Sequence, residues 1–289
     1  MISGVLPDPR RHAYRADLAA ASLRDRVAAP RYVEGAPRQV GVPVLPLKRE
    51  PRFDATLDSE VLLGETVTIY DEAEGWAWVQ LARDGYVGYL PSDGLSRHVV
   101  PARHKVTALR TYLYSQPDAK SPPLDWLSLN ARVTASGAEG NFLALAGGGY
   151  IFAGHVAVIG ERAPDYVAVA ESFMGTPYLW GGRTSLGVDC SGLVQLAVEA
   201  AGLDCPRDAD MQAAELGRII DWQGSDTPAR GDLVFWEGHV GIMTAPELLL
   251  HANAHHMATA VEPLAEARAR IAALGSEVMS VKRLLGDER

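Results

Sequence analysis

The sequence predicts an α+β domain in the C-terminal part of the chain, preceded by two small all-β barrels. Between residues 41 and 160, short runs of β-branched and aromatic residues alternate with Gly and Asp turns, which is the pattern of small barrels. From residue 161 onwards, helix-period segments come first and strand-sized apolar runs follow. Helices followed by successive strands are typical of α+β folds. The length of 289 residues is sufficient for two or three domains.

Residues 1–40 are expected to form an N-terminal arm with one short helix. The run Asp-Leu-Ala-Ala-Ala-Ser-Leu-Arg-Asp-Arg-Val at 17–27 would supply the helix, and the rest of the arm is rich in Pro and Arg. We expect the arm to pack against the body of the protein and to carry no catalytic residue.

The first barrel is expected at 41–100 and the second at 101–160. Strand-sized runs such as Gly-Trp-Ala-Trp-Val-Gln-Leu at 75–81 would build the first barrel. The second repeats the pattern more faintly, and its Gly-Gly-Tyr-Ile at 148 echoes Asp-Gly-Tyr-Val at 84. The succession of runs resembles bacterial SH3-like domains, in which a Gly-Tyr-x-Gly-Tyr segment closes the last strands.

The last domain, expected at 161–289, contains a candidate nucleophile at Cys190. Apolar residues recur at helical spacing after this cysteine, at positions 193, 196, 197 and 200. Asp189 or Cys190 would therefore stand in the first turn of a helix, where open N–H groups and the helix dipole favour negative charge. A thiol in that position ionises more easily than an ordinary cysteine, so it can serve as a nucleophile.

Two histidines follow in strand-like apolar runs, His239 in a Gly-His-Val-Gly segment and His251 after three leucines. One cysteine followed by two histidines supplies a candidate thiol, base and orienting group. The separation of twelve residues between the histidines suits a strand, a turn and a return strand. Asn253 lies two residues further on, on the same face of an extended strand, and is the alternative to His251 as the third member.

Four motifs within residues 163–260 together resemble the NlpC-type cysteine peptidases, papain-like enzymes that cut the peptides of bacterial cell-wall murein. The motifs are Thr-Pro-Tyr-Leu-Trp-Gly-Gly, Asp-Cys-Ser-Gly, Gly-Asp-Leu-Val-Phe-Trp and Gly-His-Val-Gly-Ile. The resemblance implies a papain-like fold with Cys190 as nucleophile, His239 as general base and acid, and His251 as the residue that orients His239. It also implies that the Tyr178 hydroxyl helps to stabilise the oxyanion beside the Cys190 backbone N–H.

The resemblance also suggests how a substrate is read. Relatives with two SH3-like domains cut small murein peptides after a γ-linked D-glutamate, and the free N-terminal ammonium of L-alanine needs carboxylate partners in a closed pocket. Asp189 and Asp208 are candidate acids, although Ala209 stands where these relatives carry a serine. An acid and a tyrosine of the first SH3-like domain wall off the cleft in those relatives. The candidate substrate-binding residues are therefore Asp189, Ser191, Trp180, Asp208, Glu65 and Tyr86.

These resemblances imply a γ-D-glutamyl–diamino acid endopeptidase that recycles murein peptides. The alternative is an exported hydrolase that remodels intact wall and uses the SH3-like domains as anchors. A non-enzymatic binding protein on the same fold is disfavoured because Cys190, His239 and His251 are all present. Met1–His12 contains no apolar core of a secretory signal, so we expect a cytoplasmic protein.

Composition and residue spacing exclude several classes of binding partner and cofactor. The net charge of −9 argues against nucleic acid or an anionic membrane surface, and no run of about 18 apolar residues could span a bilayer. Two cysteines exclude a disulfide framework, and we expect Cys205 to be a small buried hydrophobic residue. The spacing of His251, His255 and His256 is not one that we expect to bind zinc, so no metal and no cofactor is expected. The oligomeric state and the identity of the diamino acid stay open.

Overall fold

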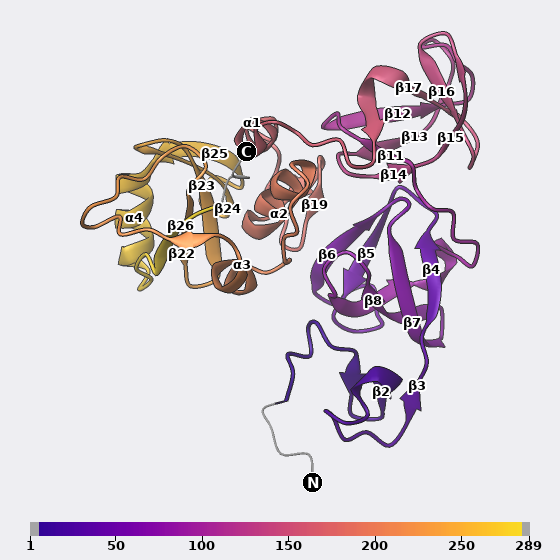
Figure 1. Cartoon of the computed structure of the whole chain (residues 1–289), viewed down its shortest axis with the longest axis horizontal. Helices are drawn as coiled ribbons and strands as arrows, with labels where there is room; N and C mark the ends of the chain where they lie inside the picture. Colours follow the sequence, from indigo (N-terminus) through magenta and orange to yellow (C-terminus); the bar gives the residue numbers. More distant parts are fainter. Residues whose placement is uncertain (1–5, 285–289) are drawn as a thin grey trace. The chain divides into compact units, whose positions relative to one another are not determined.

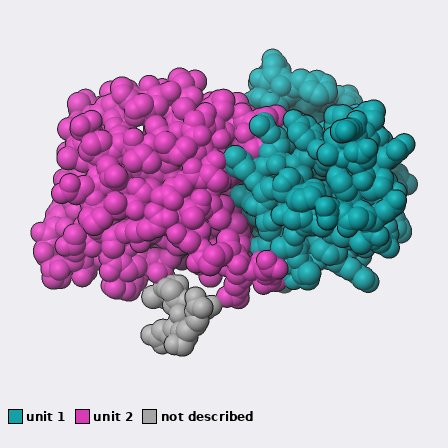
Figure 2. Space-filling view, turned by 90° about the horizontal axis from the view of Figure 1, so that it is seen from above, with its two compact units in different colours: residues 1–159 teal, residues 160–289 magenta. Residues whose placement is uncertain are grey.

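The computed structural model describes residues 6–284 of the chain (Figure 1). The chain divides into two compact units, residues 1–159 and 160–289, which are coloured separately in Figure 2. The first unit is built of strands and short 3-10 turns, whereas the second combines helices with one large sheet. The predicted α+β class, with β modules before a domain of helices and strands, is confirmed.

The helix predicted at residues 17–27 is wrong. This part of the chain forms three short strands, β1 (Tyr14–Arg15), β2 (Leu18–Ala20) and β3 (Tyr32–Val33), with a 3-10 turn at Ala21–Leu23. Leu18, Leu23 and Trp78 belong to one buried cluster. All three residues of β2 are buried, so both faces of this segment are covered. Packing against the barrel therefore overrides the local helix propensity of the Ala-rich run.

The first barrel is a single sheet of seven strands in the order β10-β4-β7-β8-β9-β5-β6. Trp76 and Trp78, two apart on β8, are both buried, as expected for barrel core. The β7–β8 hairpin turns through Glu74 and Gly75, whose positive φ values of 52° and 82° suit a tight two-residue turn. The sheet begins before the expected residue 41. Its strands are β4 (Ala36–Val40), β5 (Val44–Lys48), β6 (Leu57–Leu62), β7 (Thr66–Ala73), β8 (Trp76–Leu81), β9 (Val87–Pro91) and β10 (Leu95–Ser96).

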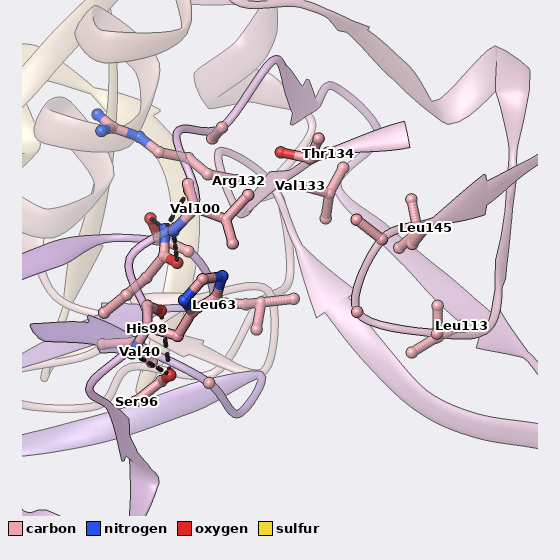
Figure 3. A pocket seen from close by; sticks show the side chains of 17 residues that line it. Val40, Leu63, Ser96, His98, Val100, Leu113, Arg132, Val133, Thr134 and Leu145 are labelled. Carbon is pink, nitrogen blue, oxygen red and sulfur yellow. Dashed lines mark hydrogen bonds between the residues drawn. The ribbon is translucent and has the colours of Figure 1, made fainter. Parts of the chain in front are cut away.

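The rest of the first unit is also all β. It contains a three-stranded sheet, β14-β11-β18, and a five-stranded sheet, β13-β12-β17-β16-β15. The strands are β11 (His104–Val106), β12 (Arg110–Tyr114), β13 (Pro123–Ser128), β14 (Arg132–Val133), β15 (Ala135–Glu139), β16 (Phe142–Leu145), β17 (Tyr150–Phe152) and β18 (Val156–Val158). Within this unit, a cavity of about 480 Å³ is lined by residues of both β modules, among them Leu63 and Leu145 (Figure 3). None of the candidate site residues lines this cavity.

The second unit is built on a six-stranded antiparallel sheet in the order β21-β26-β22-β23-β24-β25. Helices α2 and α4 lie on opposite sides of this sheet (Figure 1). The helices are α1 (Tyr166–Glu171), α2 (Cys190–Ala200), α3 (Ala209–Glu215) and α4 (Leu264–Ala273). The strands of the sheet are β21 (Arg218–Ile219), β22 (Leu233–Trp236), β23 (His239–Ala245), β24 (Leu248–Asn253), β25 (Ala258–Pro263) and β26 (Ser280–Arg283), and a separate hairpin joins β19 (Arg183–Thr184) to β20 (Gly187–Val188).

The burial of α2 shows that this helix is fixed in the core and can hold the candidate nucleophile in place. Ten of the eleven residues of α2 are buried, and the helix packs on β23 and β24. On the α4 face, Val234, Met243 and Leu264 belong to one apolar cluster. The first residue of α2 and the first residue of β23 are the cysteine and histidine that the sequence singled out. Among residues 6–284, no helix has the length and apolar character that crossing a membrane requires.

Candidate active site

Cys190 is the first residue of α2, as the spacing of apolar residues predicts. Asp189 is the N-cap in an extended conformation, and its Oδ1 accepts a hydrogen bond of 2.7 Å from the backbone N–H of Gly192. The thiol lies within hydrogen-bonding reach of the backbone N–H of Val240, the residue that follows His239. The helix start and the start of β23 therefore meet at the sulfur.

The expectation of an easily ionised thiol is wrong for the substrate-free protein. Burial raises the pKa of the Cys190 thiol to about 12, and the negative charge of Asp189 adds to this effect. The amide of Val240 and the guanidinium of Arg207 act in the opposite direction without reversing it. Desolvation thus outweighs the helix start, and the thiol needs a base.

His239 is the candidate for that base, because it begins β23 and the next residue, Val240, brings its backbone N–H to the thiol. Its Nε2 lies 2.8 Å from Nδ1 of His251, and the two ring centroids are 5.0 Å apart. Burial, and after it the positive charge of Arg270, lower the pKa of His239 to about 4. A neutral imidazole whose Nε2 is bound to a neighbour keeps Nδ1 as its remaining site for a proton.

The geometry separates the two candidates for the third position. His251 contacts His239 directly, whereas the Asn253 side chain forms hydrogen bonds with His256 and with the His251 backbone. The Asn253 side-chain oxygen Oδ1 accepts from the backbone N–H of His256 at 2.8 Å, and its side-chain Nδ2 donates to the backbone carbonyl of His251 at 3.3 Å. The structure thus gives Asn253 a role in the β24–β25 turn and brings His251 to His239.

Two residues next to His251 were not singled out from the sequence. Glu262 on β25 accepts from His251, with Oε1 and Nε2 2.6 Å apart, and Arg270 on α4 binds both Glu262 oxygens at 2.5 and 2.8 Å. The only available signal was hairpin spacing, since β25 returns alongside β24 with Ala260 opposite His251. That register cannot be predicted from the sequence unless the length and position of the β24–β25 turn are known.

The same place holds the one candidate metal-ligand group found among the described residues. Ligand atoms of His251, His256 and Glu262 lie within 4.8 Å of one another. Arg270 already binds both oxygens of Glu262, and His251 is bonded on both ring nitrogens. A cation would have to displace a guanidinium, so these residues do not fit a metal site as arranged.

Tyr178 lies near Cys190 and Asp189. Its backbone pairs with Val188 in an isolated bridge and its N–H donates to the carbonyl of Met257 at 3.0 Å. Burial raises the pKa of the phenol, and the nearby Cys190 and Asp189 raise it further. The hydroxyl therefore stays protonated and can donate a hydrogen bond to an oxyanion.

Asp189 and Ser191 are engaged by a buried arginine that the sequence analysis did not select. Arg207 donates to Asp189 at 2.9 and 2.7 Å and to the Ser191 hydroxyl at 2.9 Å. Asp189 also accepts from the backbone N–H groups of Gly181 and Gly192. The Ser191 hydroxyl also donates to Asp189, at 3.4 Å. These donors fill the acceptor positions of the carboxylate, which makes Asp189 an organiser of the cysteine loop.

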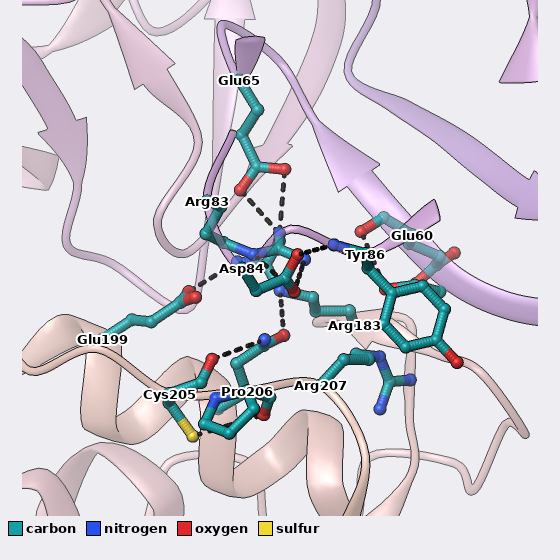
Figure 4. Close-up of polar contacts among 12 residues, drawn as sticks. Glu60, Glu65, Arg83, Asp84, Tyr86, Arg183, Glu199, Cys205, Pro206 and Arg207 are labelled. Atoms are coloured by element: carbon teal, nitrogen blue, oxygen red, sulfur yellow. Dashed lines mark hydrogen bonds and ion pairs between the residues drawn. The ribbon is translucent and has the colours of Figure 1, made fainter. Parts of the chain in front are cut away.

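The remaining candidates belong to both units of the chain. Trp180 is 60% exposed, and Asp208 is the half-buried residue before α3, whose side chain does not cap that helix. Glu65 and Tyr86 belong to the first unit and are both buried. Within that unit, Glu65 binds Arg83 at 2.8 and 3.0 Å (Figure 4). Their role in substrate binding stays a prediction.

Cys205 is buried, as predicted, and its thiol is directed to the carbonyl of Pro206 at 3.6 Å. Its own carbonyl accepts from the Gln195 side chain at 2.9 Å, and Gln195 in turn accepts from Arg183 (Figure 4). The two cysteines of the chain form no disulfide.

Comparison with known proteins agrees with this architecture. Residues 175–271 match the NlpC/P60 family, and residues 47–95 match the bacterial dipeptidyl-peptidase SH3 domain. For residues 101–160, the SH3-like assignment stays a prediction.

Among curated proteins, dipeptidyl-peptidase 6 of Lysinibacillus sphaericus is 29% identical, over 72% of this chain and 84% of that protein. The γ-D-glutamyl-L-lysine dipeptidyl-peptidase of Bacillus subtilis is 27% identical, over 69% of this chain and 73% of its own length. The fold is shared with an NlpC/P60 family protein from Bacillus cereus, with a TM-score of 0.72 and 21% identity, over 87% of this chain and all of the other. The chain is a cysteine peptidase that carries an NlpC/P60 catalytic domain with an N-terminal SH3 domain.

Proposed function

We propose that this peptidase hydrolyses the γ-D-glutamyl–diamino acid bond of murein-derived peptides that carry a free N-terminal L-alanine. The main support is that two relatives named as dipeptidyl-peptidases, one of them as a γ-D-glutamyl-L-lysine dipeptidyl-peptidase, align over 84% and 73% of their length. In addition, residues 47–95 match the bacterial dipeptidyl-peptidase SH3 domain. The thiol–imidazole arrangement at the start of α2 supplies the chemistry that such a reaction needs.

The proposed reaction uses Cys190 and His239 in turn. The Cys190 proton passes to Nδ1 of His239 while the sulfur attacks the γ-carbonyl carbon. Burial raises the pKa of the thiol and lowers that of His239, which favours the neutral pair before substrate binds, so we infer that proton transfer accompanies attack. The oxyanion accepts from the Tyr178 hydroxyl and from the Cys190 N–H at the helix start.

The intermediate then collapses by breaking the C–N bond. The leaving amine takes the proton from His239, and the acyl group stays on the sulfur as a thioester. A water molecule, deprotonated by His239, attacks the thioester, the C–S bond breaks to release the γ-D-glutamyl peptide, and His239 returns the proton to the Cys190 sulfur. No other reactant is consumed.

A requirement for a free amine would restrict the enzyme to peptides already released from the glycan, because the alanine amine is acylated in intact wall. On this basis we propose a recycling role, and a cytoplasmic location stays a prediction. Asp208 is the acid in the catalytic domain to test first, since the acceptor positions of Asp189 are filled by Arg207 and two backbone amides.

The experiment compares kcat/KM for L-Ala-γ-D-Glu-diaminopimelate, its L-lysine analogue, the N-acetylated tripeptide and intact sacculi, with products identified by mass. Removing one side of a buried charged pair costs about 3–5 kcal/mol, so acetylation should lower kcat/KM by more than about a hundredfold. Comparable values for free and acetylated peptides, or efficient release from sacculi, would overturn the proposal and favour an exported wall hydrolase. The pair of diamino acids shows which side chain the enzyme accepts.

A further inference from the structure

Glu262 is a buried carboxylate that the proposed reaction does not use. Glu262, 7% exposed, accepts from His251 Nε2 at 2.6 Å through Oε1. Arg270 donates to the same oxygen at 2.5 Å and to Oε2 at 2.8 Å. The carboxylate is therefore fixed on one side by an arginine and aimed at an imidazole on the other.

The fold builds this arrangement from two adjacent elements. In the β24–β25 ladder, His251 is opposite Ala260, so Glu262, two residues further along β25, is on the same face as His251. The chain then enters α4 directly at Leu264, and Arg270 on this helix reaches back to the carboxylate. A hairpin and one helix thus bring together three side chains from a segment of twenty residues, 251–270.

Hydrogen-bond logic fixes where the protons are. A carboxylate only accepts, so His251 must carry its proton on Nε2. Burial lowers the pKa of His251, so the ring is neutral and its Nδ1 has a lone pair. The 2.8 Å contact then requires His239 to donate from Nε2, which leaves Nδ1 of His239 unprotonated.

We propose that Glu262 is a positioning residue that acts through His251 and sets the tautomers of both histidines, so that His239 presents an unprotonated Nδ1 to Cys190, and that Arg270 holds Glu262 in place. The inference rests on the proposed roles of Cys190 and His239. Without the carboxylate, His251 could place its proton on either nitrogen. In one of these forms Nδ1–H faces His239, forces that ring to accept at Nε2, and moves the proton of His239 to Nδ1, where it blocks the base.

The first test reads the tautomers directly and does not depend on turnover. In protein with 15N-labelled histidine rings, the ring nitrogen shifts of His251 and His239 should both show Nε2 protonated and Nδ1 bare. Assignments come from the His251→Gln and His239→Gln variants. A wild-type His251 protonated on Nδ1 would overturn the proposal, whatever the enzyme does with any peptide.

The second test is kinetic and uses the full chain with the free tripeptide. Glu262→Gln, which keeps the shape and removes the charge, should lower kcat by about 10–100-fold with KM within about twofold, as loss of an outer positioning partner does. The matched control is Glu266→Gln on the exposed side of α4, which should leave kcat unchanged. An unchanged kcat in Glu262→Gln, or a loss confined to KM, would overturn the proposal.

A double-variant cycle shows whether Glu262 acts through His251. In a His251→Ala background, adding Glu262→Gln should change kcat by less than about twofold, because the ring that transmits the effect is gone. A full additional 10–100-fold loss would mean that Glu262 acts by another route. If no variant or wild-type protein cleaves the tripeptide, the proposed substrate fails while the tautomer measurement still decides the role of Glu262.

Discussion

Two buried arginine–carboxylate clusters flank the reaction centre, and they differ in what the carboxylate holds. In the cysteine-side cluster of Asp189, Ser191 and Arg207, the carboxylate accepts from an arginine and from backbone N–H groups. In the histidine-side cluster of His251, Glu262 and Arg270, one carboxylate oxygen accepts from a ring that can exist in two tautomers. The same ion-pair chemistry therefore fixes a loop in one case and the location of protons in the other.

The arginines of the two clusters also differ in how exposed they are to solvent. The Arg207 side chain is 1% exposed, whereas that of Arg270 is 22% exposed. Loss of Arg207 would strand a charge in the interior, whereas a gap left by Arg270 can admit water. We expect variants of the cysteine-side cluster to affect folding first and variants of the histidine-side cluster to affect catalysis first.

The largest effect is expected at the sulfur between the two clusters. Cys190→Ala should lower kcat by roughly 10⁶-fold, because the nucleophile is lost. The free energy of unfolding should change by no more than about 1 kcal/mol, since one small buried atom is removed. Product analysis by mass and a denaturant titration check the two statements. Near wild-type turnover would mean that the nucleophile is another residue.

The next effects should decline along the hydrogen-bonded chain. His239→Ala should lose about 10²–10⁴-fold in kcat, because general-base help of that size is removed. His251→Ala should lose less, and Asn253→Ala should leave kcat nearly unchanged while destabilising the turn by about 1 kcal/mol. Steady-state kinetics and thermal unfolding of the three variants give the order. A larger kcat loss in Asn253→Ala than in His251→Ala would assign the third position to Asn253.

The stability contrast between buried and exposed arginines can be measured with one substitution at two sites. Arg207→Met should destabilise the protein by about 3–5 kcal/mol, because Asp189 is left buried without its partner. Arg230→Met is the control, since Arg230 forms exposed ion pairs with Asp165 and Glu171 and should cost no more than about 1 kcal/mol. Urea unfolding of both variants tests this. Equal losses would mean that burial does not distinguish the two arginines.

Positions that depend on local periodicity could be predicted from the sequence, whereas positions that depend on the register between strands could not. The helical spacing after Cys190 located the start of α2 correctly. His251 and Asn253 lie on one strand face, so alternation alone could not decide between them, and the choice depends on the turn that Asn253 caps. Glu262 and Arg270 become neighbours of His251 only through the β24–β25 register and the entry into α4.

Two expectations failed for a common physical reason. Leu18–Ala20 was expected in a helix, and the Cys190 thiol was expected to ionise easily. In both cases a local preference was outweighed by burial, against Trp78 in the first and by desolvation of the thiol in the second. Local sequence reports propensity and helix dipoles well, but burial depends on segments far away in the chain.

The smallest expected effect is a shift in pH dependence that separates Arg270 from Glu262. His239 lies near His251, Arg270 and Asp189. His251 lies near Glu262, Arg270, His255 and His256. The positive charge of Arg270 lowers the pKa of both His239 and His251. Arg270→Met should therefore raise both pKa values. Since His239 must be neutral to accept the thiol proton, the acid limb of kcat/KM should move to higher pH. The rate at the acid end should fall by about tenfold or less while the plateau at higher pH stays unchanged.

Glu262→Gln should instead lower the plateau itself, because the tautomer is disturbed at every pH. A pH profile of kcat/KM for both variants distinguishes the two outcomes, and an acid limb in Arg270→Met that moves to lower pH would contradict the assigned sign.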